Sequence, residues 1–300
     1  MVNFNPSLPY PPAVLAEEVK SLPLSISEIR SAYEDLHFST LDIIFAQEMT
    51  SFDPKIDRFD NIALFKKSLV KLKAMPPEEY CFNANQIDIS EERSLIATQY
   101  PFKALGQYYF WLTCLEKSAY IVDLTSEEER RKNHMQCYYP TSVGEKKSFQ
   151  ELTIRCEAEE SLDTVPQCQI WTYQIFFKEE PCKQVKRVHF QNWPDHQASG
   201  LDDVIPLIHY LQTLEVEERQ MPLIHCRAGV GRTGTLSTIL AIAQLAKEQT
   251  LTSENLLPQL NALILKGRSQ RSPYFVQQLS QYRMLVRLWE KIVADPDCLK

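Results

Sequence analysis

Apolar and polar positions along the chain predict short strands joined to longer helices. One stretch combines both, because the apolar run 222–224, typical of a buried strand, precedes HCRAGVGRTGT and then apolar residues at helical spacing. Glycines within this turn give its backbone the freedom to reverse direction tightly. The start of the following helix presents unpaired N–H groups and a positive dipole end, which favour an anion. The apolar helix positions are Leu236, Ile239, Leu240 and Ile242.

The N-terminal part of the chain predicts an arm followed by a helix. Residues 1–24 hold five prolines and predict an irregular arm, with a short helix around 14–20. Ser25 and Glu28 form a capping-box pattern, so a second helix is expected to begin there and to reach about Met49. Its apolar stripe is expected to pack on the core.

Further elements are predicted between this helix and the C-terminus. Two β-rich runs within 151–178 indicate antiparallel strands with a turn near Pro166. The charged run 127–132 is typical of a solvated loop. Helices are expected at 254–265 and, for the last one, up to about Val293.

Composition and charge narrow the class of protein. The chain has 300 residues, 44% hydrophobic and 24% charged, as in a globular protein with a sizeable core. Its formal net charge of −7 disfavours a nucleic-acid surface, and neither an ordinary signal peptide nor a transmembrane stretch is visible. The eight cysteines include no C-x-x-C pair. That pattern fits neither a zinc site nor a disulfide scaffold and indicates a reducing compartment such as the cytoplasm.

Two residues of the glycine-rich turn carry candidate chemistry. Cys226 enters the turn, and Arg232 follows six residues later, where the loop can curl it back beside the sulfur. A thiol in such a cationic surrounding loses its proton readily, so Cys226 is expected to be a thiolate near neutral pH. The planar guanidinium of Arg232 can bind two oxygens of a phosphate at once. A buried structural cysteine is the alternative interpretation.

The glycine-rich turn also matches the dinucleotide-binding fingerprint G-x-G-x-x-G at residues 229–234. That fingerprint requires an acidic residue at the end of a second strand about 20 residues further on. Glu248 and Glu254 lie near that distance, but the surrounding sequence, LAKEQTLTSENL, is not typical of a strand. The dinucleotide interpretation is therefore the weaker one.

The pattern His-Cys-x5-Arg-Thr resembles the signature of the cysteine-dependent protein tyrosine phosphatases, and HCRAGVGRT looks like secreted bacterial effectors of the Yersinia type. The resemblance covers about residues 50–290. It implies an α/β (α+β) fold, a single tyrosine-phosphatase-like domain whose central, highly twisted mixed β-sheet is flanked by helices. Residues 1–50 would form the N-terminal arm and helical lead-in, and residues 51–295 the catalytic domain. Within it, 110–111 would lie in a helix and 121–125 in a buried strand.

The resemblance implies a set of catalytic residues. Cys226 would be the nucleophile, Arg232 the phosphate clamp, and Asp195 the general acid and base. Gln277 would position the water of the second step, and Thr233 would donate a hydrogen bond to the sulfur. With these groups the reaction needs no metal or cofactor, and we expect a monomer.

Residues that would bind the substrate or support the site come from six segments. Within 58–72, which read alone predict a loop and a strand, Phe59 would stack on the phosphotyrosine ring and Asn61 would bind the substrate backbone. Glu129 would brace the signature arginine, and Tyr138 would hydrogen-bond His225. Trp193 and Pro194 would belong to the acid loop, the mobile loop that carries Asp195. The remaining residues of the site would be the second glutamine, Gln281, and the backbone amides of Arg227, Ala228, Gly229, Val230 and Gly231.

Three alternatives stay open. A dual-specificity or phosphoinositide phosphatase shares Cys-x5-Arg, although this loop holds Arg227 and no lysine. A catalytically weak phosphotyrosine-binding module typically loses the cysteine, the acid or the arginine, all of which are present here. A scaffold protein with an incidental motif is the third alternative. The Yersinia-type likeness also motivates the hypothesis of an effector that a bacterium secretes into a host cytosol, where it acts on phosphotyrosine proteins.

Overall fold

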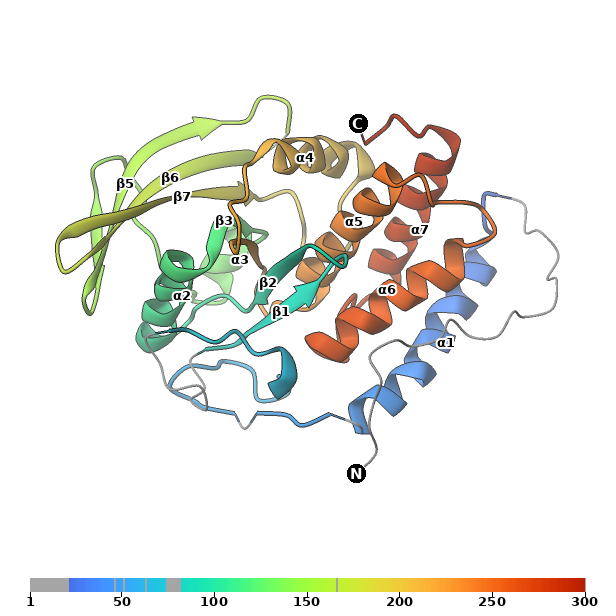
Figure 1. The fold of residues 1–300 in the computed structure, drawn as a ribbon, viewed down its shortest axis with the longest axis horizontal. Coiled ribbons are helices and arrows are strands. Elements are labelled where there is room, and N and C mark those ends of the chain that lie inside the picture. The colour runs from blue at the N-terminus through green and yellow to red at the C-terminus, as the bar shows by residue number, and fades with distance from the viewer. Residues whose placement is uncertain are drawn as a thin grey trace.

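An eight-stranded mixed sheet runs through the middle of the molecule (Figure 1). The computed structural model describes residues 22–45, 47–50, 52–62, 64–73, 82–165 and 167–299. The expected short helix around 14–20 and the turn at Pro166 lie outside them. The strands are β1 (Ala84–Asp88), β2 (Ser94–Thr98), β3 (Ser118–Asp123), β4 (Lys146–Phe149), β5 (Leu152–Ser161), β6 (Cys168–Phe177), β7 (Glu180–Phe190) and β8 (Met221–His225).

The order of the strands across the sheet is β1-β2-β8-β3-β7-β6-β5-β4. Neighbours among β2, β8, β3 and β7 are parallel, and the remaining pairs are antiparallel. The central strands β3 and β8 are buried along most of their length, as expected for parallel strands covered on both faces. In β5 buried and more exposed positions alternate, because one face is covered and the other is open.

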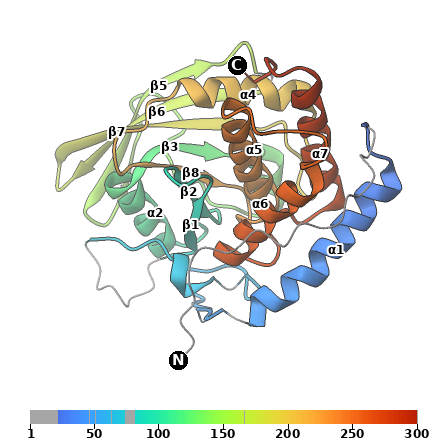
Figure 2. The same ribbon diagram turned by 45° about the vertical axis from the view of Figure 1, so that its right-hand side comes forward.

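Helices cover both faces of the sheet (Figures 1 and 2). On one face α5 contacts β2 and β8, α6 and α7 pack against α5, and α1 packs against α6 and α7. On the other face α2 contacts β3, β4, β5 and β7. Buried side chains accordingly form two core clusters, one among α1 and α4–α7 and one around α2. The helices are α1 (Ile26–Phe45), α2 (Ala104–Glu116), α3 (Glu127–Lys132), α4 (Leu201–Thr213), α5 (Gly231–Lys247), α6 (Leu256–Gln270) and α7 (Leu279–Ala294), with a 3₁₀ turn η1 at Lys66–Ser68.

The expected mixed sheet flanked by helices is confirmed, as are most elements. At the start of α1 the Ser25 backbone N–H donates to Glu28 Oε2 (2.8 Å) and the Glu28 N–H donates to Ser25 Oγ (3.2 Å), which confirms the capping box. The helix ends at Phe45, earlier than expected.

Two predictions about local structure are wrong. The charged run 127–132 is the helix α3 and not a loop, because Ser126 caps it and acidic residues precede basic ones along its dipole. Within the described part of 58–72 the chain forms η1 and isolated bridges at Phe65 and Leu69 in place of a strand. Sequence reasoning also missed α4 and the edge strand β4.

Two further findings concern the described residues as a group. None of their helices combines the length and apolar character that crossing a membrane requires. Their seven cysteines are free of disulfide bonds.

Candidate active site

The loop after β8 is shaped by its outward-facing carbonyl groups. Arg271 donates from Nε to Gly229 O (2.9 Å) and from Nη2 to Ala228 O (3.2 Å), and the backbone N–H of Tyr100 donates to Arg227 O (3.1 Å). The carbonyl of Val230 accepts from the N–H of residues 234 and 276. Since the N–H of each peptide points opposite to its carbonyl, the loop amides face inward around Cys226. This arrangement favours an anion at the centre of the loop.

Gly229 is required by the path of the loop. Its φ is +71°, and a Cβ at this position would overlap with the backbone of Thr98 and Gln99 on the neighbouring strand segment. The loop can therefore lie flat against the end of β2. Gly229 contributes backbone geometry and does not line the cavity.

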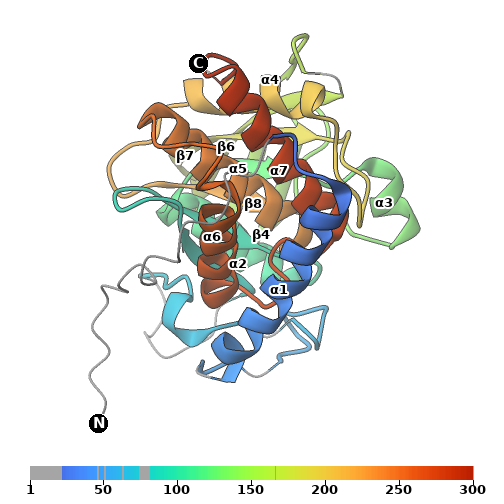
Figure 3. The same cartoon turned by 90° about the vertical axis from the view of Figure 1, so that its right-hand side faces the viewer.

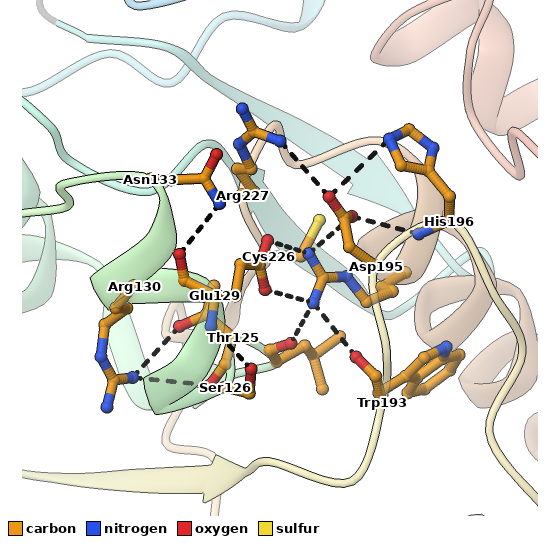
Figure 4. Close-up of polar contacts among 12 residues, drawn as sticks. Thr125, Ser126, Glu129, Arg130, Asn133, Trp193, Asp195, His196, Cys226 and Arg227 are labelled. Carbon is orange, nitrogen blue, oxygen red and sulfur yellow. Dashed lines mark hydrogen bonds and ion pairs between the residues drawn. The ribbon is translucent and has the colours of Figure 1, made fainter.

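Arg232, at the start of α5, is the residue on which distant segments converge. Figure 4 shows three residues that it contacts, Glu129, Trp193 and Asp195, gathered near Cys226. Its Nη1 and Nη2 donate to the two carboxylate oxygens of Glu129 at 2.7 and 2.6 Å. Nη1 also donates to Leu124 O (2.8 Å) and Trp193 O (3.1 Å), and Nη2 to Asp195 Oδ1 (2.8 Å). Only 1% of this side chain is exposed. Glu129 thus lies against the signature arginine, as the sequence analysis expected.

The environment of Arg232 keeps its positive charge available for an anion. Burial opposes the charge, but the hydrogen bonds of Glu129 and the charges of Cys226, Glu129 and Asp195 together raise the pKa of Arg232 above its ordinary value. Its buried Nε donates to no acceptor among the described residues, and the buried Oγ1 of Thr233 is also without a partner there. Buried polar atoms without partners are rare in folded proteins, so both atoms are suited to a bound ligand.

Asp195 lies among three basic side chains. Besides the contact with Arg232, its Oδ2 lies 3.5 Å from Arg227 Nη1 and 3.7 Å from His196 Nε2. The loop that carries it is fixed by Trp193, whose Nε1 donates to Gln197 O (3.0 Å) and whose side chain is fully buried. Pro194 precedes Asp195 and accepts at its carbonyl from the Gln197 N–H (3.3 Å). The acid loop therefore lies directly over the signature arginine.

A cavity of about 150 Å³ connects these groups. It brings together eleven of the residues singled out in the sequence, from segments that are far apart along the chain. Two lining residues, Ile62 and His196, were missed, although each adjoins a predicted segment. The lining residues are Phe59, Asn61, Ile62, Asp195, His196, Cys226, Arg227, Ala228, Val230, Gly231, Arg232, Gln277 and Gln281.

One wall of the cavity is aromatic. The Phe59 ring packs edge-on against Phe102 at 5.8 Å between centroids, and the Arg227 guanidinium lies 5.6 Å from its centre. Asn61 is exposed at the rim. A flat apolar ligand of the width of a phenyl ring can stack on this wall while its polar end reaches Cys226.

The two glutamines, Gln277 and Gln281, also line the cavity. Only Gln281 belongs to α7, because the helix begins at Leu279, and Gln277 lies in the segment before it. Gln281 Oε1 accepts from the N–H of Gln277 (3.0 Å) and of Gln278 (3.2 Å), so its side chain caps the helix and holds the preceding segment.

A buried polar network lies beneath Cys226. His225 Nε2 is 2.6 Å from the Tyr138 hydroxyl, which is the expected contact, and 3.7 Å from Asp123 Oδ1. Asp123 also accepts from Arg187 Nε and Nη2 at 3.1 and 2.5 Å. Burial lowers the pKa of His225 to about 4, so its imidazole is neutral at pH 7. Sequence reasoning missed the ion pair, because Asp123 is the last residue of β3 and Arg187 is one of several charged residues in β7.

Comparisons with known proteins agree with this site. The family model described as protein-tyrosine phosphatase matches residues 53–290. Tyrosine-protein phosphatase 3 of Schizosaccharomyces pombe is 26% identical over 204 residues, 66% of this chain and 67% of that protein. The human tyrosine-protein phosphatase non-receptor type 12 is 29% identical over 246 residues, 79% of this chain but 30% of that protein. The chain therefore spans less than a third of the length of the human relative.

Solved structures share the fold. The catalytic domain of human protein tyrosine phosphatase non-receptor type 18 has a TM-score of 0.75 and 21% identity, with 89% of this chain and 96% of that one covered. A Trypanosoma brucei protein tyrosine phosphatase gives the same TM-score and identity, with 92% and 97% covered. Because the family model spans most of the sequence and includes both the signature loop and the acid loop, this chain belongs to the protein-tyrosine phosphatase family.

Proposed function

We propose that the chain hydrolyses phosphotyrosine in protein substrates through a cysteinyl-phosphate intermediate. One observation carries the proposal: Cys226, 3% exposed, lies in a loop of inward-facing amides, beside a buried arginine Nε without a partner among the described residues. Such a loop provides donors for the three equatorial oxygens of a phosphoryl group. The aromatic wall formed by Phe59 supports an aryl phosphate over a smaller alkyl phosphate.

In the first step the Cys226 thiolate attacks phosphorus in line with the leaving tyrosyl oxygen. A sulfur–phosphorus bond forms as the phosphorus–oxygen bond to tyrosine breaks. Arg232 and the loop amides hold the equatorial oxygens, and Asp195 gives its proton to the phenolate. The product of this step is free tyrosine side chain and a phosphocysteine.

In the second step water attacks the phosphocysteine. Gln277 lines the cavity and would orient this water, and Asp195, now a carboxylate, takes one of its protons. The sulfur–phosphorus bond breaks, and inorganic phosphate and the thiolate are released. The Oγ1 of Thr233 would donate to the departing sulfur, which stabilises the thiolate.

The contact between Asp195 and Arg232 has a consequence for the order of events. The Asp195 carboxylate accepts from a guanidinium N–H of Arg232 that a phosphate oxygen could also use. Substrate binding must therefore displace Asp195 from Arg232 and leave it facing the tyrosyl oxygen.

Phosphate release from matched substrates tests the function. We would compare phosphotyrosine peptide, phosphoserine peptide and a phosphoinositide, with a reductant present, for wild type, Cys226→Ser and Asp195→Asn. The expected result is turnover of phosphotyrosine that is lost in Cys226→Ser and about 10²–10⁴-fold slower in Asp195→Asn. Preferred turnover of the phosphoinositide would support the lipid-phosphatase alternative. Phosphopeptide binding without turnover by the wild type would make the chain a binding module.

A second proposal concerns where the chain acts, and it rests on the signature alone. The likeness of HCRAGVGRT to Yersinia-type effectors supports delivery by a bacterial secretion system into a host cytosol, a reducing compartment that suits free cysteines. The relatives compared above come from eukaryotes. A translocation assay with and without residues 1–50 tests this proposal. Absence of delivery from any secretion-competent bacterium would contradict it.

A further inference from the structure

The segment that presents Gln277 to the cavity has a strained backbone. Val276, the residue before it, has a φ of +57°, a left-handed conformation that a β-branched residue rarely adopts. Strain of this kind persists only where surrounding contacts hold it, and it is often found at functional sites. The groups that hold the Val276 conformation therefore decide where the Gln277 side chain lies.

Arg268 of α6 holds the two carbonyls before Gln277. Its Nε donates to Phe275 O (3.1 Å) and its Nη2 to Val276 O (3.4 Å). The other terminal nitrogen of this buried side chain, Nη1, donates to α1, at Leu36 O (3.2 Å) and Thr40 Oγ1 (2.6 Å). The guanidinium thus links the N-terminal helix to the strained segment.

Tyr33 of α1 holds the third carbonyl. Its hydroxyl donates to Gln277 O at 2.6 Å, and its ring packs on Tyr282 of α7 at 5.4 Å between centroids. Figure 3 shows α1 alongside α6 and α7, and both helices contact it. All three successive carbonyls of residues 275–277 are therefore held, one by α1 directly and two through a guanidinium that α1 itself anchors.

We propose that Tyr33 and Thr40 are positioning residues for the second chemical step, through which the N-terminal helix sets the placement of Gln277. The inference rests on the proposed function, in which Gln277 orients the water that hydrolyses phosphocysteine. Neither residue lines the cavity, so neither touches the substrate. Loosening α1 slows hydrolysis of the intermediate, while formation of the intermediate, which uses Cys226, Arg232 and Asp195, keeps its rate.

Pre-steady-state kinetics of Tyr33→Phe test the proposal. The substitution removes one hydroxyl and keeps the ring. With p-nitrophenyl phosphate as the probe, we expect an initial burst of nitrophenolate close to one equivalent per enzyme, a burst rate constant within about twofold of wild type, and steady-state turnover reduced about 3- to 10-fold, the loss expected for one hydrogen bond. The transfer ratio, meaning the amount of phosphate transferred to added glycerol divided by the amount transferred to water, should change as well, because the position of the attacking water has changed.

Two further variants make the test decisive. Thr40→Val removes the oxygen that accepts from Arg268 Nη1 with little change of shape, and it should show the same burst. Tyr173→Phe is the matched control, because its buried hydroxyl also donates to a carbonyl, Pro140 O at 3.1 Å, away from Gln277. This control should show no change in burst amplitude.

The outcomes separate the two proposals. Normal wild-type turnover with unchanged burst and transfer ratio in Tyr33→Phe and Thr40→Val would overturn the positioning role and leave the proposed function standing. Equal slowing of both steps, with melting temperature lowered to the same degree, would show a structural role only and would also overturn it. Absence of wild-type turnover on every phosphate ester would overturn the proposed function and this inference together.

Discussion

At the scale of single residues, the site depends on which acceptors bind the N–H groups of the Arg232 guanidinium. All five hydrogen bonds that Arg232 donates to described residues go to residues more than 100 positions away or to the loop 193–195, and its Nε alone donates to no protein acceptor among them. The side chain is thus rigid before any ligand binds. A rigid donor loses little conformational entropy on binding, which favours tight recognition of an anion.

The brace on Arg232 gives a prediction at this scale. Glu129→Gln keeps the size of the side chain but replaces one carboxylate oxygen by an amide that cannot accept, so one of the two hydrogen bonds is lost. We expect KM for phosphotyrosine peptide and the inhibition constant of vanadate to rise about 10-fold or more, from a loss of roughly 1.5–3 kcal/mol. Steady-state kinetics and vanadate titration measure both.

The neighbouring Glu128 provides the control, because it is exposed on the same helix. Glu128→Gln should leave KM and vanadate inhibition unchanged. Equal kinetics for Glu129→Gln and wild type would contradict the bracing role.

At the scale of elements, nearby residues determine the conformation of β8, of the loop after it and of α5, and Gly229 is the exception. The strand is apolar, the helix carries small and apolar residues, and the loop needs a left-handed residue where it meets the end of β2. Only glycine combines a positive φ with room for the Thr98 backbone. The loop conformation therefore depends on a contact with a strand that lies far away in the sequence.

Two glycine variants separate conformational strain from steric overlap. Gly144 also has a positive φ, +84°, but a Cβ there would meet no atom within 4 Å. Gly144→Ala should cost about 1 kcal/mol of unfolding free energy, whereas Gly229→Ala should cost roughly 3 kcal/mol or more and abolish vanadate binding. Urea denaturation and vanadate titration provide the measurements. Equal losses of unfolding free energy in the two variants would contradict the proposed effect of the overlap with the Thr98 backbone.

At the scale of the whole molecule, buried polar groups gather where the parallel strands end. β3, β7 and β8 contribute Asp123, His189 and His225, and all three side chains are buried. Ligand sites of open α/β sheets form at the carboxyl ends of parallel strands, and this network supports the site from below. It also makes the stability of the molecule depend on pH.

Burial lowers the pKa of His225 to about 4 and that of His189 to about 3, below their ordinary value of 6.5. Between roughly pH 6.5 and pH 4 the unfolded chain binds protons that the folded protein does not. Unfolding free energy should therefore be full above about pH 6.5 and fall as pH decreases, by up to about 1.4 kcal/mol per pH unit for each histidine. Melting temperatures between pH 7 and pH 4.5 measure the slope.

Substitution identifies the groups responsible. His189→Asn should flatten the pH dependence, because one titrating group is removed, whereas His37→Asn, at an exposed position of α1, should leave the slope unchanged. A melting temperature of the wild type that stays constant from pH 7 to pH 4.5 would be inconsistent with buried neutral histidines.

Local sequence patterns predicted much of this molecule, and their failures have physical causes. The capping box at Ser25, the apolar strand before Cys226 and the acid loop at 193–195 depend on neighbouring residues, and the structure contains all three. The run 127–132 forms a helix and not the predicted loop, although its cap and its order of charges are visible in the sequence, because a dense run of charges is more typical of a solvated loop. The edge strand β4 has only four residues, so its pattern was too short to detect.

The sequence by itself determined the reactive elements, because a thiol, a glycine-rich turn and an arginine lie within eleven residues and their chemistry is local. Only the tertiary structure decided how these elements are held. Glu129 and Arg232 are 103 positions apart, and Tyr33 and Gln277 are 244 positions apart. Contacts of such separation depend on how the strands order in the sheet and how the helices pack on it, and no local pattern encodes that order.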